Sequence, residues 1–321
     1  MAQTVDVIVP IFNREKDIPI LINEMKRQTF KHFRMIFVDD GSTDNSWTIL
    51  SDALSDAPFE YLLVKKRNGG AGSARNTGIR TANADWICFV DSDDALHPQF
   101  LEHMIRATED ANAQVGICRF KAFDGGKRAT DISLNPLQYR RITAAQGMQA
   151  FLTEWISPCC LLINREYLKK NALFFDEACQ YCEDLPFVAS VIANAQQLAV
   201  IDRELYYYYT HQGSLHRSPS LEKFISAITC FEATAQYIAH QQTPAADVFR
   251  KTGSARYYIA TLRRASVQLP RHDFLSLAQR IDFAQYRNQI SSLPHAQKFA
   301  SYLMMLSKNI FYYTNRLIFK D

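Results

Sequence analysis

The chain has 321 residues, of which 47% are hydrophobic, and its 36 Lys and Arg against 33 Asp and Glu give a formal net charge of +3. This composition suits a globular protein with one large core or a domain plus an appendage, and we expect no nucleic-acid partner. No apolar stretch reaches the roughly 18 to 20 residues of a membrane-spanning helix. Because Asp6 interrupts the first apolar run and Pro10 ends it, no signal peptide is predicted and a cytoplasmic location is expected.

The first part of the chain alternates short β-branched or aromatic runs with amphipathic stretches, which is the βαβ pattern. The expected strands are 5–9, 35–38, 61–64 and 86–90, and the expected helices are 17–28, 46–54, 73–81 and one that begins at Pro98. Near-continuous apolar strands separated by helices predict an α/β fold with a mostly parallel sheet that is covered on both faces.

The pattern weakens over residues 121–142, where Gly125-Gly126-Lys127-Arg128 indicates a loop. Beyond Ser214 the chain is helix-like and basic. Residues 216–321 hold 14 Lys and Arg against 6 Asp and Glu, whereas residues 1–215 hold 22 against 27. The two parts are therefore expected to face different partners.

An acidic run, Asp91-Ser92-Asp93-Asp94, directly follows the strand expected at 86–90. Three carboxylates so close together repel one another unless a cation binds, and hard oxygen ligands suit Mg²⁺ or Mn²⁺ that also bridges phosphate oxygens. An alternative interpretation is a solvated acidic turn that caps the next helix, with Asp94 as the capping residue.

A second acidic pair, Asp39-Asp40, follows the strand expected at 35–38. A carboxylate here can accept a hydrogen bond from a nucleotide base, and Phe12 either stacks on that base or fills the core. The glycine-rich turn 68–76 opens a helix, where backbone N–H groups and Arg75 either face a diphosphate or simply form a tight turn.

In order and spacing, several segments resemble the motifs of family-2 glycosyltransferases, which as a class are bacterial surface-polysaccharide enzymes. The segments are 7–13, 38–44, 68–78 and 89–94, followed by the Glu-Asp motif at 182–187 and the closing stretch at 207–217. The resemblance covers about residues 4–215 and implies a GT-A fold for residues 1–215, with a helical region at 216–321.

The resemblance also implies roles for individual residues. Asp40 resembles the uracil-binding acid and Asp39 its neighbour, Arg75 a nucleotide-side contact, Asp91 a ribose or metal contact, Asp93 the metal ligand, and Asp184, beside Glu183, the catalytic base. Pro10, Phe12, Asn13, Gly70 and Ser92 belong to the same nucleotide-binding motifs. His211 lies where some relatives have an extra metal or diphosphate contact, and a structural histidine is the alternative interpretation.

The implied activity is inverting transfer of a hexose or N-acetylhexosamine, with Mn²⁺ or Mg²⁺, from a UDP-sugar to a hydroxyl of a growing or lipid-linked surface glycan. A base must accept the hydroxyl proton and a cation must stabilise the leaving diphosphate. Glu183 and Asp184 could instead only start a helix. A catalytically inactive sugar-nucleotide-binding or scaffold protein is the alternative of another class, whereas Pro10 to Asn13 lacks the glycine-rich basic loop of nucleotidyltransferases.

Two further features remain open. Cys179 and Cys182 form a CxxC, which is interpreted as a pair of buried thiols unless Cys159 and Cys160 complete a zinc site. The basic, apolar tail from Lys298 to Lys320 predicts either a helix at the surface of an anionic membrane, peripheral on its inner face, or a helix docked on the chain or on a second subunit of a homo-oligomer.

Overall fold

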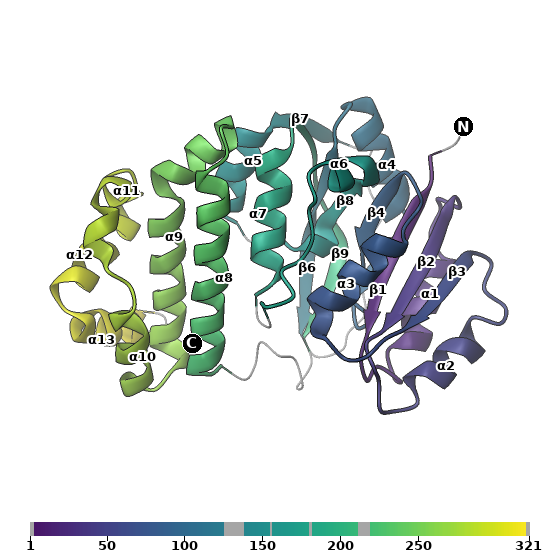
Figure 1. Cartoon of the computed structure of the whole chain (residues 1–321), viewed down its shortest axis with the longest axis horizontal. Helices are drawn as coiled ribbons and strands as arrows, with labels where there is room; N and C mark the ends of the chain where they lie inside the picture. Colours follow the sequence, from purple (N-terminus) through teal and green to yellow (C-terminus); the bar gives the residue numbers. More distant parts are fainter. Residues whose placement is uncertain (1–2, 125–137, 155, 180–181, 211–218, 319–321) are drawn as a thin grey trace. The chain divides into compact units, whose positions relative to one another are not determined.

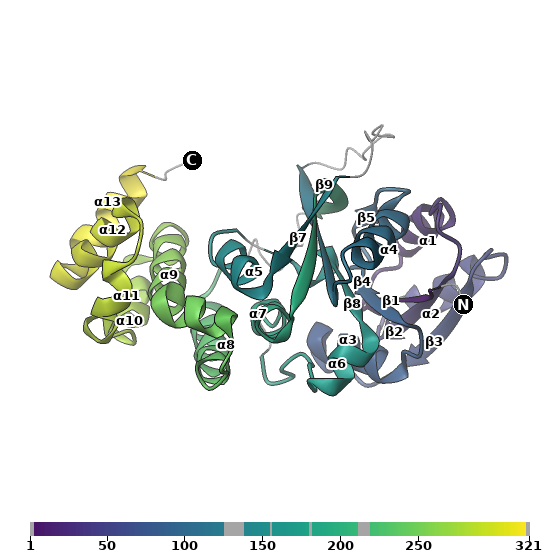
Figure 2. The same cartoon turned by 90° about the horizontal axis from the view of Figure 1, so that it is seen from above.

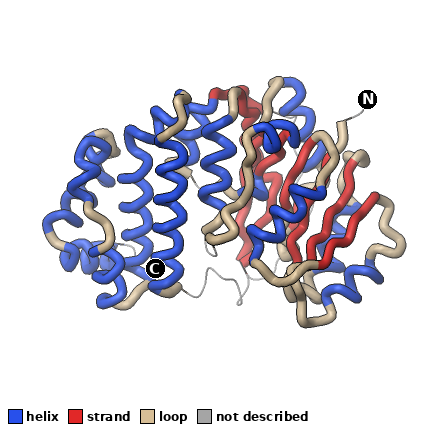
Figure 3. The backbone as a smooth tube through the Cα atoms, in the orientation of Figure 1, coloured by secondary structure: helices blue, strands red, loops and turns tan. Residues whose placement is uncertain are grey.

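A computed structural model of the chain describes residues 3–124, 138–154, 156–179, 182–210 and 219–318 (Figure 1). It divides into two compact units, the first made of Met1–Ala144 with Ile156–Gln212 and the second of Ala145–Trp155 with Gly213–Asp321. The expected boundary between residues 215 and 216 lies outside the described residues. The strands, red in Figure 3, all belong to the first unit.

The first unit begins with the βαβ pattern that the sequence predicts. Its elements are β1 (Val5–Ile11), α1 (Ile18–Lys26), β2 (Phe33–Asp39), α2 (Ser46–Ala53), β3 (Glu60–Lys65), α3 (Gly70–Thr81), β4 (Trp86–Phe89), β5 (Ala95–Leu96) and α4 (Phe100–Asp110). Each expected strand and helix of this part is present, with ends that differ by a few residues. Strands β1, β2 and β4 are buried along most of their length, because helices cover the sheet on both sides.

The rest of the first unit turns the parallel sheet into a mixed one. Its elements are β6 (Val115–Asp124), β7 (Tyr139–Thr143), β8 (Leu161–Asn164), α6 (Arg165–Lys170), α7 (Asp184–Asn194) and β9 (Gln197–Thr210). The strand order is β3-β2-β1-β4-β8-β6-β9-β5, with β7 paired to β9. Strands β1 to β4 pair in parallel, as predicted. Strand β8 runs antiparallel to both of its neighbours, so the whole sheet is mixed.

The expectation of a loop over residues 121–142 is wrong at both ends. Residues 121–124 continue β6, where they pair with β9, and residues 139–142 begin β7 on the other side of β9. The burial of β7 does not alternate from residue to residue, so its sequence shows no clear strand period. Gly125-Gly126-Lys127-Arg128 lies outside the described residues.

Helices cover both faces of the sheet. Figure 2 shows α1 and α4 on one face and α3 and α6 on the other. Helix α4 packs on β6 and β9, and α3 packs on β1 and β2. The approach of α3 is close because Gly78 has no side chain: a Cβ there would lie 2.3 Å from the Cγ2 atom of Ile8. Gly78 therefore sets how closely the helix that carries Arg75 approaches the sheet.

The second unit is helical, as predicted for the C-terminal region. Its elements are α5 (Ala144–Phe151), α8 (Leu221–Ala239), α9 (Pro244–Gln268), α10 (Arg271–Gln279), α11 (Arg287–Ser291), α12 (His295–Leu306) and α13 (Lys308–Ile318). The long helix α9 contacts α8, α11, α12 and α13. Stacked rings fill this core, with Phe231 and Tyr257 3.7 Å apart between centroids and Phe274 parallel to Phe311.

The close contact of α3 with β1 yields a prediction about stability. In an open helix, Gly78→Ala would stabilise the protein by about 0.5–1 kcal/mol. Here the new methyl group meets Ile8, so we expect the free energy of unfolding in urea to fall by about 1–3 kcal/mol.

The control is a double-mutant cycle with Ile8→Ala, which removes the atoms that the new methyl group meets. In that background Gly78→Ala should be neutral or stabilising. An equal cost of Gly78→Ala in both backgrounds would show that contact with Ile8 is not the cause.

Candidate functional site

The predicted site residues gather where β1, β2 and β4 end. Ile11, the last residue of β1, pairs in register with Asp39, the last of β2, and the Val90 N–H donates to the Ile8 carbonyl. The loops that follow these three strands therefore start at one edge of the sheet. This carboxyl edge is where open α/β sheets bind ligands.

The loop after β1 is tied to the loop after β2. Asn13, with a φ of 54°, donates its N–H to Ser42 Oγ at 3.0 Å and accepts the Thr43 N–H on Oδ1 at 2.8 Å. Asn13 thus joins the two loops, and Pro10 lies inside β1. The Phe12 side chain next to them is 46% exposed, so the interpretation of Phe12 as core is wrong and its ring is available to a ligand.

Asp40 is buried and its carboxylate holds the glycine turn. Oδ1 accepts from Lys66 Nζ at 2.6 Å, and Oδ2 accepts from the Gly70 N–H at 2.7 Å. The Gly69 N–H contacts both oxygens, at 3.0 and 3.1 Å. Gly70 has a φ of 86°, which a side chain would disfavour. The carboxylate of Asp40 is therefore occupied by the residues that begin α3.

Asp39 differs from its neighbour in having an acceptor to spare. Its Oδ1 accepts the Ser42 N–H at 3.0 Å. Its buried Oδ2 has no hydrogen-bond partner among the described residues, and Lys65 Nζ lies 3.9 Å away. A buried carboxylate oxygen without a donor is costly, so this atom is the acceptor at this edge that a ligand N–H would satisfy.

Arg75 of α3 joins three carboxylates. Its Nη2 donates to Asp91 Oδ1 at 2.8 Å, and its Nη1 donates to Glu183 Oε1 at 3.0 Å and to Asp184 Oδ1 at 3.1 Å. The guanidinium lies 5.3 Å from the centre of the Phe175 ring. Arg75 is 4% exposed, so burial lowers its pKa, but the facing carboxylates raise it further and the net pKa is higher than usual.

The segment before α7 brings the Glu-Asp pair to Arg75. Cys182 has a φ of 63°, Glu183 is the residue before the helix, and Asp184 is its first residue. The pair does start a helix, but neither side chain caps it, because both bind Arg75. Burial raises the pKa of Asp184 to about 7, and Glu183 and Asp91 add to the increase while Arg75 opposes it.

The acidic run after β4 separates into side chains with different partners. Asp94 is buried and accepts from the Tyr206 hydroxyl at 2.6 Å and from the Tyr209 N–H at 3.0 Å. The interpretation of Asp94 as a helix cap is therefore wrong, since it binds β9. Asp93 pairs with Arg14 Nη2 at 3.1 Å, a contact that sequence analysis missed. Ser92, between Asp91 and Asp93, is buried.

The donors at this edge suit a divalent cation that arrives with phosphate. Within the described residues, no group of three or more His, Cys, Asp or Glu side chains is arranged to hold a metal ion alone. Asp91 and Asp93 are 33% and 21% exposed, and each now pairs with a guanidinium. Mg²⁺ commonly takes one or two carboxylates and completes its shell with water and phosphate, so these two carboxylates fit it. His211 lies outside the described residues. The interpretation of Cys179 and Cys182 as a pair of buried thiols is wrong, because Cys179 is in a disulfide and Cys182 is a partly exposed thiol.

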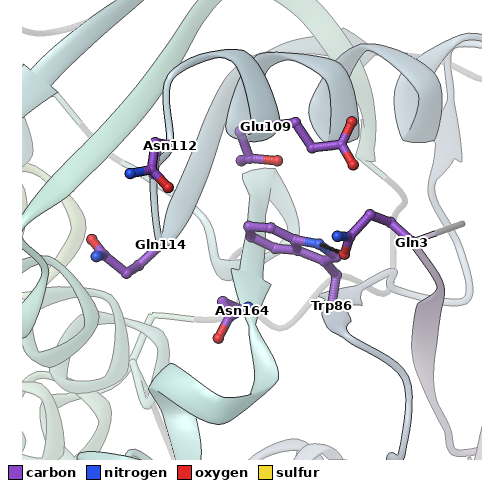
Figure 4. Close-up of a pocket in the computed structure, with 8 residues that line it drawn as sticks. Gln3, Trp86, Glu109, Asn112, Gln114 and Asn164 are labelled. Atoms are coloured by element: carbon purple, nitrogen blue, oxygen red, sulfur yellow. Dashed lines mark hydrogen bonds between the residues drawn. The ribbon is translucent and has the colours of Figure 1, made fainter. Parts of the chain in front are cut away.

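A pocket of about 520 Å³ lies at the opposite edge of the sheet (Figure 4). Its labelled lining residues are Gln3, Trp86, Glu109, Asn112, Gln114 and Asn164. Gln3 and Trp86 lie at the amino ends of β1 and β4, and the indole N–H of Trp86 already donates to Gln3. With a single carboxylate and no cationic side chain in its lining, this pocket lacks the groups that diphosphate chemistry needs.

Comparisons with known proteins point to one family. The family model described as glycosyl transferase family 2 matches residues 6–171. The chain is 30% identical over 228 residues to the uncharacterized glycosyltransferase EpsJ of Bacillus subtilis, and this alignment covers 68% of this chain and 64% of that protein. It is 27% identical over 214 residues to the poly(ribitol-phosphate) beta-N-acetylglucosaminyltransferase TarS of Staphylococcus aureus, covering 66% of this chain and 36% of TarS. The chain thus matches less than two thirds of the length of these relatives.

Solved structures share the fold. Residues 1–349 of S. aureus TarS, in complex with UDP-GlcNAc, superpose with a TM-score of 0.76 at 20% identity over 99% of this chain and 92% of that chain. A mannosyltransferase of Pyrobaculum calidifontis, in complex with GDP-Man and Mn²⁺, gives a TM-score of 0.57 at 14% identity, over 100% and 89%. The predicted GT-A fold with a helical C-terminal region is confirmed by this likeness.

The arrangement around Arg75 yields a prediction about stability and pH. Arg75→Met leaves Asp91, Glu183 and Asp184 facing one another without a cation. We expect a loss of about 2–4 kcal/mol in the free energy of unfolding at pH 8, less than for a fully buried pair because the carboxylates are partly hydrated. The unbalanced carboxylates bind protons more tightly in the folded state, so stability falls as pH rises and part of the loss should be recovered at pH 5.

Arg80→Met, on the same helix, is the matched control. Arg80 is 57% exposed and pairs with Glu177 at 3.1 Å, so its loss should cost less than about 1 kcal/mol at either pH. Urea unfolding of both variants at pH 5 and pH 8 makes the comparison. A loss in Arg75→Met that is as large at pH 5 as at pH 8 would contradict the electrostatic explanation.

Proposed function

Because the chain belongs to glycosyl transferase family 2, we propose that it transfers a hexose or N-acetylhexosamine from a UDP-sugar to an acceptor hydroxyl on a growing surface glycan. The observation that carries the proposal is the convergence of Asp39, Asp91, Asp93 and Asp184 on one edge of the sheet, with Arg75 between the last two loops. UDP is supported as the nucleotide by the likeness to the TarS structure, which was solved in complex with UDP-GlcNAc.

Asp39 and Phe12 are proposed to bind the base. Asp39 Oδ2 is the buried acceptor without a donor, and uracil has one N–H that can supply it. The exposed ring of Phe12 can stack on the same base. Asp40, which the resemblance assigned to the base, is proposed to act one step away by holding the turn at Gly69 and Gly70.

Asp93 and Asp91 are proposed to hold Mn²⁺ or Mg²⁺ together with the donor diphosphate. When bound, the cation offsets the negative charge that develops on the leaving group. Arg14 Nη2 lies 3.1 Å from Asp93 Oδ2, and its guanidinium is proposed to contact the diphosphate when the donor binds. Arg75 keeps the Asp91 carboxylate oriented toward the same position.

Asp184 is proposed to be the general base. It accepts the proton of the acceptor hydroxyl while that oxygen attacks the anomeric carbon and the bond to the diphosphate breaks on the opposite side, which inverts the configuration. A pKa near 7 suits a base that must take a proton at neutral pH. Glu183, which shares Arg75 with it, is proposed to position Asp184 through that guanidinium.

The alternative is a protein that binds sugar nucleotides without turnover, as part of a polysaccharide assembly complex. Such a protein would need the base and diphosphate contacts but no general base. The raised pKa of Asp184 favours the enzyme. A protein that only binds the sugar nucleotide has no need of a carboxylate whose pKa is raised by burial near the proposed diphosphate position.

The proposal also covers where the protein works and what its second unit binds. An enzyme that extends a lipid-linked glycan from cytoplasmic nucleotide sugars would work at the inner face of the cytoplasmic membrane. The second unit, 216–321 in the sequence-based division, is proposed to provide that attachment, with self-association through the same region as the competing possibility.

A donor panel tests the reaction and its metal requirement. We expect release of UDP from a UDP-sugar in the presence of acceptor and Mn²⁺ or Mg²⁺, and little release from GDP-sugars. Asp93→Ala or EDTA should lower the rate at least about 100-fold and weaken UDP binding measured by calorimetry with the metal.

Asp17→Asn is the control, because Asp17 lies 4.0 Å from Arg14 without reaching the proposed metal position. It should keep the rate within a few fold. Full activity in EDTA would exclude the metal, and tight UDP binding without any turnover across the panel would favour the binding protein.

The assignment of Asp184 predicts a pH profile. The carboxylate must be ionised to accept a proton, so kcat/KM should rise with pH through a midpoint near 7. Asp184→Asn should lower kcat by about 10² to 10⁴ while leaving the affinity for UDP nearly unchanged, and it should abolish this midpoint.

Glu183→Gln removes the same charge from the same guanidinium and serves as the comparison. It should retain kcat within about tenfold, with a shifted midpoint because Glu183 raises the pKa of Asp184. If the two variants lose kcat equally, or if Asp184→Asn keeps the wild-type profile, Asp184 is not the base.

A further inference from the structure

Helices α12 and α13 expose seven large apolar side chains, whereas Tyr237 is the other large apolar residue exposed among the described residues of the second unit. The exposed fractions are 67% for Phe299, 50% for Tyr302, 79% for Leu306, 49% for Ile310, 55% for Tyr313, 82% for Leu317 and 64% for Ile318. Within each helix they are three or four residues apart, except that Leu317 and Ile318 are adjacent, which places those of each helix along one side of it. We call these seven residues the outer apolar set.

The outer apolar set is distinct from the face that forms the core of the unit. Met304 of α12 and Phe311 and Tyr312 of α13 are buried, and Phe311 and Tyr312 contact the ring of Phe274 in α10. Each helix thus has one apolar side packed on protein and another apolar side left outside. Folding of the chain explains the first side and leaves the second without a partner among the described residues.

The charge on this part of the chain is of one sign. Residues 283–318 contain Arg287, Lys298, Lys308 and Arg316 and no Asp or Glu. Lys298 and Lys308 are partly exposed on the two helices, whereas Arg316 is held by the Leu269 carbonyl at 3.2 Å. A surface that meets this set must therefore accept exposed apolar and aromatic side chains and supply negative charge.

We propose that the outer apolar set of α12 and α13 inserts into the interface of an anionic lipid bilayer, with Lys298 and Lys308 next to the lipid phosphates. Aromatic and aliphatic side chains flanked by lysines are the composition of helices that lie in the plane of a membrane. Among the described residues, no helix is long and apolar enough to cross a membrane. The surface is thus suited to a helix pair that lies on the bilayer.

Charge favours the bilayer over a second copy of the chain. Two copies that met through these helices would bring Lys298 and Lys308 toward each other, and residues 283–318 supply no acid to pair with them. Anionic lipid removes that repulsion, and each basic side chain near the leaflet then adds about fivefold to binding. This inference does not rest on the proposed sugar transfer.

Sedimentation of the full chain with vesicles tests the proposal. We expect the wild type to bind vesicles of phosphatidylcholine with phosphatidylglycerol, to bind pure phosphatidylcholine at least about tenfold more weakly, and to lose affinity as salt is raised. The double variant Leu306→Ser with Leu317→Ser should weaken binding to anionic vesicles at least about tenfold. Lys298→Gln with Lys308→Gln should weaken it about 25-fold there and leave binding to neutral vesicles unchanged.

The matched control replaces exposed apolar residues elsewhere. Tyr61→Ser with Leu62→Ser alters side chains that are 43% and 36% exposed on edge strand β3, and it should bind like wild type. Circular dichroism and the thermal midpoint confirm that each variant is folded. Wild type that ignores anionic vesicles, or a Leu306 and Leu317 variant that binds them as well as wild type, would overturn the proposal. A wild-type dimer in light scattering that the same variant converts to monomer would assign the surface to a second copy instead.

Discussion

The site depends on one buried cation. Arg75 is 4% exposed, whereas Asp91, Glu183 and Asp184 around it are 33%, 16% and 27% exposed, so the guanidinium lies beneath the carboxylates and directs them outward. Without it, three acids from two loops would repel one another, and Glu183 and Asp184 would lose their contact with α3. The close approach of α3 to β1, which Gly78 permits, is what brings Arg75 under both loops. The charge balance of the site therefore depends on how closely α3 packs on the sheet.

Neighbouring acids in this site have different physical tasks. The carboxylate of Asp40 is saturated by Lys66, Gly69 and Gly70, while that of Asp39 keeps one oxygen without a donor. In the same way Asp94 binds Tyr206 of β9, while Asp93 pairs with the partly exposed Arg14. One member of each pair shapes the loop and the other remains for a ligand. A pair of acids after a strand in this site is therefore one structural residue and one candidate ligand-binding residue.

The sequence predicted the parallel half of the sheet well because β1, β2 and β4 are buried along most of their length and the helices between the strands are amphipathic. It failed for residues 121–142, where the half-exposed β7 shows no clear period, and for Asp94, whose partner lies 112 residues away. It found Arg75, Glu183 and Asp184 as separate motif residues, but not that they touch across 108 and 109 positions. Arg14 carried no signal of its own. Its pairing with Asp93 depends on how the loops after β1 and β4 meet, and local patterns do not encode that meeting.

The C-terminal helices show why periodicity alone could not decide what the tail does. Apolar residues on α12 and α13 occupy both the core side, with Phe311 and Tyr312, and the outer side, with Leu306 and Leu317. A pattern of spacing identifies each as helical, yet it cannot say which side meets protein. Only the packed structure separates them, since α9 and α10 cover one side and leave the other exposed. Exposing a second apolar side of a helix to water is unfavourable in free energy. An anionic bilayer would accept that apolar side, and it would also match the absence of acids from residue 283 to residue 318.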